Sequence, residues 1–402
     1  MLKTTSFIKT LIIFPLIATS CLDPNSEKIK KVFAQESSPE SNSVNPVDNL
    51  SENENISTDE QESIKNLKNA ETTIFYENFD RQPDWTSTLH TLSQSQSIRT
   101  NHILPDGWTD LYQGTQWSPE LGLPDKHASL EILDVNHDKT RNSSKKSAVM
   151  WRESYSRGWK NWASDSQLVK YLDKSYKEIY GEFYIRFSPN FYGINNVGSW
   201  ASKIFRIGSY RGTGSIVSGY QNDLGPIFIW DYKHDQYGVR NVYTTRGGPW
   251  GENYYFPSGE DISGSYNFSS HTKAHGINGS DPKLPDQVNG GFVLDGETLV
   301  DHEQVFGDAN KWTKVAFYLR MNSAPGVKDG EMRQWINDVQ ITHKEEISWV
   351  SSNIENKMVG WNYFAIGGND YFQAFPNEDQ FEDWYAIDDV LIATKPPDGL
   401  IP

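Results

Sequence analysis

Residues 311–322 read KWTKVAFYLRMN, and a turn-forming DG pair at 329–330 separates them from RQWINDVQI at 333–341. Both are short segments in which apolar and polar side chains alternate between turn residues, which is typical of β-strands. Four further segments share this pattern: YGEFYIRF (180–187), SKIFRI (202–207), PIFIWDY (226–232) and AIDDVLIA (386–393). The spacing predicts an all-β, two-sheet antiparallel sandwich over residues 73–402, with long loops at 247–275 and 276–308 and one short helix at 165–177.

The composition excludes several classes of protein. The chain has 402 residues, a net charge of −16, a mean hydropathy of −0.65 and a single cysteine, yet it holds 14 Trp, 20 Tyr and 19 Phe. An aromatic content of this size argues against global disorder, and the absence of repeated long apolar runs argues against a multi-span membrane protein. The negative charge disfavours nucleic acid as a partner. We expect a monomer without an organic cofactor.

The N-terminal segment predicts export. Lys3 and Lys9 precede a short apolar core and the sequence Ala18-Thr19-Ser20-Cys21, which resembles a bacterial lipobox. Cys21 is then the lipidation site, and the chain is anchored by lipid in the bacterial cell envelope; the alternative is an ordinary cleavable signal and a secreted protein. Residues 22–72 carry eleven acidic and five basic side chains with one aromatic, which predicts a disordered acidic stalk.

Residues 73–402 begin with FYENFD (75–80), end with YAIDDVLIA (385–393), and contain the Trp-led segment 311–322 followed by Asp-Gly and WIND (335–338). This order of elements resembles the concanavalin A-like lectin/glucanase jelly roll, and within it the alginate lyase-like polysaccharide lyases of family 14 type. The resemblance implies a surface-tethered enzyme that cleaves uronate-containing polysaccharide by β-elimination. The alternatives are a noncatalytic, lectin-like carbohydrate-binding protein and an adhesive surface lipoprotein. No Glu-x-Asp pair of the kind that glucanases place on a strand occurs in the chain.

β-Elimination next to a carboxylate needs a base, an acid and cations that neutralise the negative charge. The resemblance implies a strand lysine and a tyrosine, which fall here on Lys203 and Tyr243, with Arg246 and Arg320 as further catalytic candidates. The expected substrate-binding residues are Arg206, Trp230, Tyr232, His234, Asn322, Arg333 and Trp335. Strict strand alternation puts Lys203 and Arg206 on opposite faces unless a bulge intervenes.

Two features leave alternatives open. The segment Gly225–Trp230 lacks the Ser-x-Arg that such lyases tend to carry, so either other cations substitute or the protein binds glycan without cleaving it. The acidic side chains of Glu77, Asp80 and Asp388, on the first and last strands, are oxygen donors suited to one structural calcium ion.

Overall fold

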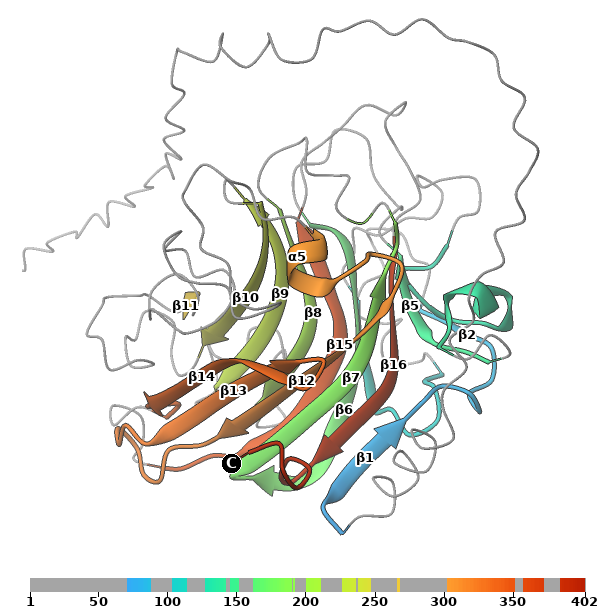
Figure 1. The fold of residues 1–402 in the computed structure, drawn as a ribbon. Coiled ribbons are helices and arrows are strands. Elements are labelled where there is room, and N and C mark those ends of the chain that lie inside the picture. The colour runs from blue at the N-terminus through green and yellow to red at the C-terminus, as the bar shows by residue number, and fades with distance from the viewer. Residues whose placement is uncertain are drawn as a thin grey trace, which may run out of the picture. The chain divides into compact units, whose positions relative to one another are not determined.

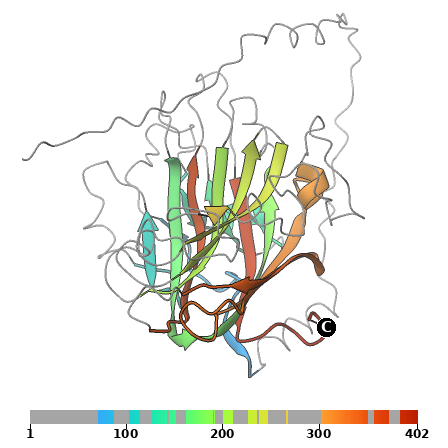
Figure 2. The same cartoon turned by 90° about the vertical axis from the view of Figure 1, so that its left-hand side faces the viewer.

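Two antiparallel β-sheets pack face to face in the computed structural model (Figures 1 and 2). The structure describes residues 71–87, 103–113, 127–141, 145–151, 162–189, 191, 200–210, 226–235, 238–246, 266–267, 302–350, 357–371 and 384–401. The predicted all-β sandwich is confirmed. The lipobox, the acidic stalk and most of both long loops lie outside the described residues. Within those residues, no helix has the length and apolar character needed to cross a bilayer.

The sheet nearer the viewer in Figure 1, sheet A, has the order β14-β13-β12-β7-β16-β5-β4-β2, with β1 paired to β16. Its strands are β1 (Thr73–Glu77), β2 (Trp85–Thr86), β4 (Leu130–Ile132), β5 (Ala148–Trp151), β7 (Glu178–Phe187), β12 (Trp312–Arg320), β13 (Gly330–Ile336), β14 (Val339–Ile347) and β16 (Trp384–Ala393). The first and last strands of the sandwich are therefore neighbours.

The second sheet, sheet B, has the order β11-β10-β9-β8-β15-β6-β3. Its strands are β3 (Asp110–Gln113), β6 (Trp162–Tyr176), β8 (Trp200–Gly208), β9 (Ile227–Asp235), β10 (Gly238–Arg246), β11 (Tyr266–Asn267) and β15 (Trp361–Tyr371). Two short helical segments are also described, η3 (Asp134–Lys139) and α5 (His302–Phe306). Because Phe306 of α5 packs into the core against Tyr232, the helix covers one part of the sandwich.

The core between the sheets is largely aromatic. Phe183 of sheet A lies 4.8 Å from Phe205 of sheet B between ring centroids, and Phe317 lies 5.7 Å from Phe205 in a stacked arrangement. Large rings dominate the apolar area that a sandwich buries. A polar bridge also crosses this core, because the amides of Asn241 and Gln334 bond to each other from opposite sheets.

Two sequence predictions need correction. Residues 165–177 form no helix, since the segment belongs to β6 and pairs with β15 through nearly its whole length. Residues 333–341 are not one strand but a hairpin: Asn337 and Asp338 both have positive φ, at 48° and 65°, and connect β13 to β14. Two consecutive residues of this kind define the tight turn that best matches the twist of paired strands.

Candidate functional site

The face of sheet B that points away from the core carries the candidate site. On β9, Trp230 and Tyr232 point into the core, so Asp231 between them points outward. On β8, Lys203 is the register partner of Asp231, and Phe205 is the register partner of Trp230. Ile204 between them has no partner of its own, so it forms a β-bulge. Because of this bulge, Lys203 shares the outer face.

Arg206 lies on the same face. It pairs with Ile229 of β9 and Ala365 of β15, which both lie outside the main core. Only 2% of Arg206 is exposed, whereas Lys203 is half-buried. The bulge therefore brings together two cations that strict alternation would separate.

Tyrosines extend this face toward β6 and β3. Tyr363 of β15 is fully buried and bonds to Arg206 through its side chain. Tyr171 stacks on Tyr210 with ring centroids 5.3 Å apart, and its hydroxyl donates to Asp110 Oδ2 at 3.1 Å. Half-buried Tyr112, Tyr171 and Tyr210 pack against this cluster, so aromatic rings lie beside the two cations.

The protonation states on this face follow from burial. Desolvation raises the pKa of Tyr363 to about 12, although the Arg206 guanidinium acts in the opposite direction. Burial and the nearby Asp110 carboxylate also raise the pKa of Tyr171. Both hydroxyls therefore keep their protons at neutral pH and act as hydrogen-bond donors.

Gln167 of β6 also lies on this outer face, two residues before Val169. Its register partners are Tyr112 on β3 and Gly367 on β15, the strands on either side of β6. Sequence reasoning missed Gln167, Tyr171, Tyr210, Asp231 and Tyr363. The signal for the first two was present, because as a strand SQLVKY puts Gln167, Val169 and Tyr171 on one face.

The other predicted residues of sheet B divide into two groups. Trp230 and Tyr232 are fully buried, and both side chains pack in the core between the sheets. Neither side chain is therefore part of the candidate site on the outer face. Tyr243, Arg246 and His234 lie on β10 and β9, and their side chains are outside the described residues. By backbone register Tyr243 pairs with Trp230, while Arg246 pairs with Ile227 of the outer face. Their roles remain predictions.

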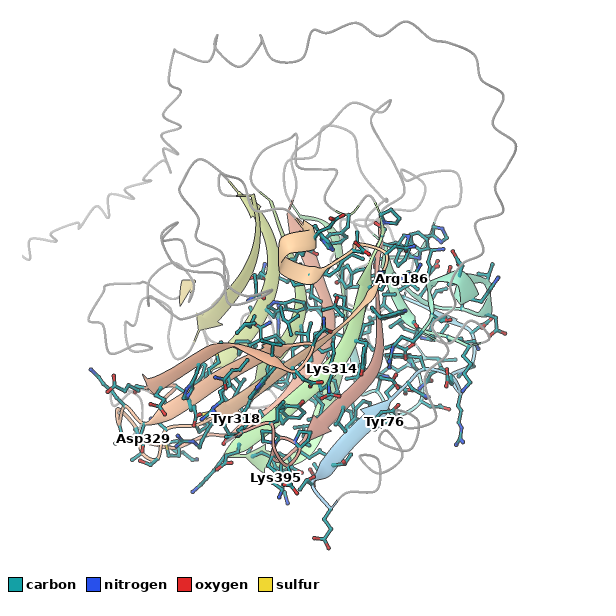
Figure 3. The ribbon with its side chains drawn as sticks, viewed as in Figure 1. Tyr76, Arg186, Lys314, Tyr318, Asp329 and Lys395 are labelled. Carbon is teal, nitrogen blue, oxygen red and sulfur yellow. The ribbon has the colours of Figure 1, made fainter. Side chains whose placement is uncertain are left out.

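The predicted residues of β12 and β13 lie on the opposite side of the sandwich. Core residues alternate along β12 and β13 with Arg320, Arg333 and Trp335, so these three lie on the outer face of sheet A. Figure 3 shows Lys314 and Tyr318 of the same face. Trp335 is buried there against Tyr180. Because sandwich sheets pack about 10 Å apart, these residues do not share a site with Lys203.

Asn322 has a local structural role. Its Nδ2 donates to the carbonyl oxygens of Ala324 and Val350, and its Oδ1 accepts from the Val350 amide at 3.0 Å. These bonds connect the loop after β12 to the loop after β14.

The three residues predicted to hold calcium are engaged by donors of the protein itself. Glu77 accepts from the Phe79 amide at 2.7 Å and from Gln82, Asp80 pairs with Lys145 at 2.8 Å, and Asp388 accepts from Ser147 at 2.6 Å. Calcium takes six to eight oxygen ligands, so these occupied carboxylates fit a calcium ion poorly. The calcium ion stays a prediction, and the junction of β1 and β16 is held by hydrogen bonds and ion pairs.

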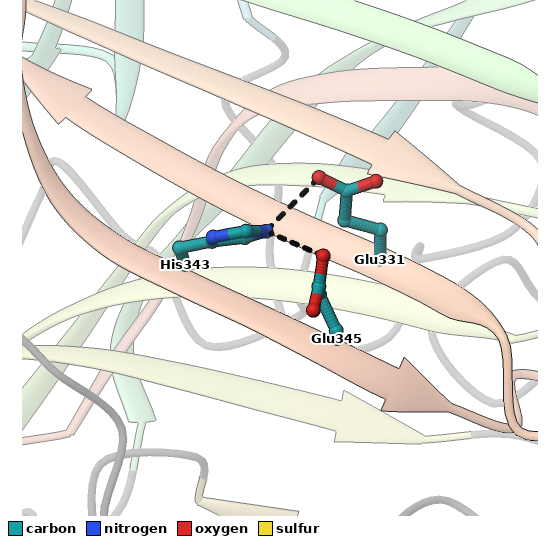
Figure 4. A group of neighbouring side chains, drawn as sticks. All are labelled: Glu331, His343 and Glu345. Atoms are coloured by element: carbon teal, nitrogen blue, oxygen red, sulfur yellow. Dashed lines mark hydrogen bonds and ion pairs between the residues drawn. The ribbon is translucent and has the colours of Figure 1, made fainter. Parts of the chain in front are cut away.

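Glu331, His343 and Glu345 form the one group within the described residues whose ligand atoms are close enough to hold a metal ion (Figure 4). His343 Nε2 lies 3.1 Å from Glu331 Oε1 and 3.4 Å from Glu345 Oε1. Glu331 also pairs with Arg320 at 2.8 Å and with Arg333 at 2.5 Å.

Burial acts to raise the pKa of Glu331, but hydrogen bonds from these two arginines outweigh it and lower the pKa overall. Two guanidinium groups on one carboxylate disfavour a further cation. We therefore interpret the group as an ion-pair cluster.

Comparison with known proteins gives structural similarity only. No protein-family model matches the chain, and no curated protein matches it. Solved structures similar to it include an endo-beta-1,4-glucuronan lyase from the fungus Trichoderma reesei, with 11% identity, a TM-score of 0.42 and coverage of 81% of this chain and 96% of that one.

An alginate lyase mutant in complex with alginate tetrasaccharide has 10% identity, a TM-score of 0.41 and coverage of 81% and 98%. The PL-14 alginate lyase from Aplysia kurodai has 13% identity, a TM-score of 0.39 and coverage of 81% and 100%. At these identities and TM-scores, the similarity does not define an activity for this chain.

Proposed function

We propose that the chain is a polysaccharide lyase that cleaves uronate-containing polysaccharide by β-elimination on the outer face of sheet B. The observation that carries this proposal is the bulge at Ile204, which puts Lys203 and Arg206 on one face beside a tyrosine cluster. An acidic chain with a net charge of −16 can bind a polyanion only where cations are concentrated, because screening limits their reach to roughly 8 Å.

The reaction breaks the C5–H and C4–O4 bonds of the uronate and forms a C4=C5 double bond. Lys203 neutralises the carboxylate and the negative charge that builds on it as the C5 proton leaves, and buried Arg206 adds a second positive charge. A tyrosine in its phenolate form accepts the C5 proton and then donates that proton to the departing O4 oxygen. Half-buried Tyr210 is the candidate on this face, whereas Tyr243, implied by the resemblance, is the register partner of core-facing Trp230; substitution of each by Phe tests this assignment.

A noncatalytic carbohydrate-binding protein is the second candidate function. Half-buried Tyr112, Tyr171 and Tyr210 give the same face aromatic surface, which contacts sugar rings well with or without cleavage. An adhesive surface lipoprotein would use this surface in the same way.

One assay separates these functions. Purified protein is mixed with alginate, glucuronan and a neutral glucan, and the ultraviolet absorbance of unsaturated products is followed over time. A rise with a uronate polymer supports the lyase. Retardation in a gel containing the polymer, without any absorbance change, supports the carbohydrate-binding protein and contradicts the lyase.

The location of the protein is a further part of the proposal. We propose export and anchoring in a bacterial cell envelope through a lipid on Cys21, with residues 22–72 as a spacer; the support is the position of the sole cysteine at the end of the signal-like segment. Cys21→Ala should move the protein from the membrane fraction to the soluble fraction. A variant that fractionates like the wild type would contradict the anchor.

A further inference from the structure

We infer that the guanidinium group of Arg141 is a built-in cation that takes the place of a structural metal ion at the junction of β1 and β16. This inference concerns the scaffold of the sandwich and goes beyond the proposed function, on which it does not depend. It names the residue that allows the acidic side chains of this junction to do without calcium.

Two consecutive buried carboxylates make a cation necessary at this junction. Asp388 and Asp389 of β16 are 4% and 7% exposed, and Asp389 has a positive φ of 47°. The register between β16 and β7 shifts after Asp388, which pairs with Tyr184, and resumes at Leu391, so β16 contains a β-bulge here. Buried carboxylates that lack both a cation and hydrogen bonds are strongly destabilising.

Arg141 contacts both carboxylates. Its Nη1 donates to Asp389 Oδ2, and the two side chains are only 8% and 9% exposed. Its backbone amide lies 3.5 Å from Asp388 Oδ2. The guanidinium carbon lies 3.4 Å from the centroid of the Tyr184 ring, and arginine makes such contacts with aromatic faces favourably. The positive charge is therefore buried, paired with a carboxylate and held over a ring.

Hydroxyl groups of two other segments also contact these carboxylates. The Tyr76 hydroxyl donates to Asp389 Oδ1, and Ser147 Oγ donates to Asp388 Oδ2 at 2.6 Å. Calcium binds in proteins to carboxylates together with neutral oxygen atoms. The junction has this kind of oxygen-rich setting, and the positive charge within it belongs to Arg141.

The ion pair joins segments that are distant in the chain, as a structural ion would. Arg141 comes shortly after η3 and lies 248 positions before Asp389 of β16. Tyr76 of β1 bonds to the same carboxylate. One carboxylate therefore holds the segment after η3, the first strand and the last strand together.

Calcium dependence tests the inference, with the full chain measured in a chelator and in millimolar calcium. The wild type should have the same Tm in both. Arg141→Ala should lower the Tm in the chelator by about 5 °C, the shift expected when a buried charge loses its partner in a domain of this size. Calcium should restore at least half of that loss, because the space of the guanidinium is then open to an ion beside two carboxylates.

Lys145 provides a matched control at the same junction. Its Nζ lies 2.8 Å from Asp80 Oδ2, but its side chain is 44% exposed. Lys145→Ala should change the Tm by less than about 1 °C, because an exposed ion pair contributes little stability. The Tm of this variant should not respond to calcium.

A double-mutant cycle tests whether Arg141 compensates the charge of Asp389. Asparagine tolerates the positive φ of this position, so Asp389→Asn removes the charge and keeps the backbone. In this background, Arg141→Ala should lower the Tm by less than half as much as in the wild type. The double variant should also lose the response to calcium.

Three results would overturn the inference: an Arg141→Ala variant as stable as the wild type, a lower Tm that calcium leaves unchanged, or an equal loss in both backgrounds of the cycle. If Arg141→Ala fails to fold in the chelator, folding in calcium supports the inference. Failure to fold in calcium as well overturns it.

Discussion

Lys203 and Arg206 point to the same side of sheet B although they lie three positions apart on one strand. Ile204 is unpaired in the ladder between β8 and β9, so alternation restarts at Phe205 and Arg206 returns to the face of Lys203. Bulges of this kind redirect side chains next to functional sites. The proposed chemistry depends on this single local irregularity.

The opposite face of the sandwich should be irrelevant to catalysis. Arg320 is part of the Glu331 ion-pair cluster on the outer face of sheet A, and its side chain is about one third exposed. Arg320→Gln should leave product formation within about twofold of the wild type and lower stability by no more than about 1 kcal/mol, since exposed ion pairs contribute little. A loss of activity without a loss of Tm would place the site on sheet A.

His302 should make the stability depend on pH. It is buried beside Phe187, and its Nδ1 lies 2.8 Å from the Tyr232 hydroxyl. Burial lowers the pKa of His302 to about 4 from an ordinary value of 6.5. The unfolded chain therefore binds a proton in a range where the folded chain does not, and stability falls as the pH falls from 6.5 toward 4.

The expected loss over this range is about 3 kcal/mol, and it is complete only below the folded pKa. Chemical denaturation of the wild type and of His302→Gln at pH 7, 6 and 5 measures it. The variant should show a shallower dependence on pH. Identical slopes for both proteins would show that His302 does not titrate in this way.

Chelation tests the calcium prediction at the junction of β1 and β16. Because Lys145 pairs with Asp80 and Ser147 donates to Asp388, these carboxylates are already compensated. We expect the Tm to be the same with calcium and with a chelator in excess. A rise in Tm with calcium that saturates and is lost in Asp80→Asn would show that the ion displaces these partners.

The sequence predicted the sheets better than it predicted the site. Strands such as β7 and β12 were predictable because their alternation and bounding turns are local properties. The hairpin at Asn337 was not predictable in this way, because Asn and Asp also occur near the ends of strands and do not by themselves mark a turn. β6 was mistaken for a helix because its pairing with β15 is a long-range contact that propensity does not report.

The site was harder to predict for a related reason. The sequence does not say which of the two sheets a strand joins. Arg320 and Arg333 belong to strands of sheet A and Lys203 to a strand of sheet B, so their outer faces lie on opposite sides of the sandwich. The bulge at Ile204 has no signature in SKIFRI, so alternation alone placed Arg206 on the wrong face. Gln167 carries no charge and belongs to no motif, so nothing in the sequence marks it as part of this face.

Lys203→Ala, tested for release of unsaturated products from a uronate polymer, is the most direct measurement of the proposed function. A half-buried strand lysine on the outer face contributes little to the core, so the variant should keep the Tm of the wild type within a few degrees. Its turnover should fall by at least about a hundredfold, because no other described side chain replaces an ammonium at that position. Arg320→Gln, assayed in parallel, should retain activity. A folded Lys203→Ala variant that cleaves the polymer at the wild-type rate would contradict the account.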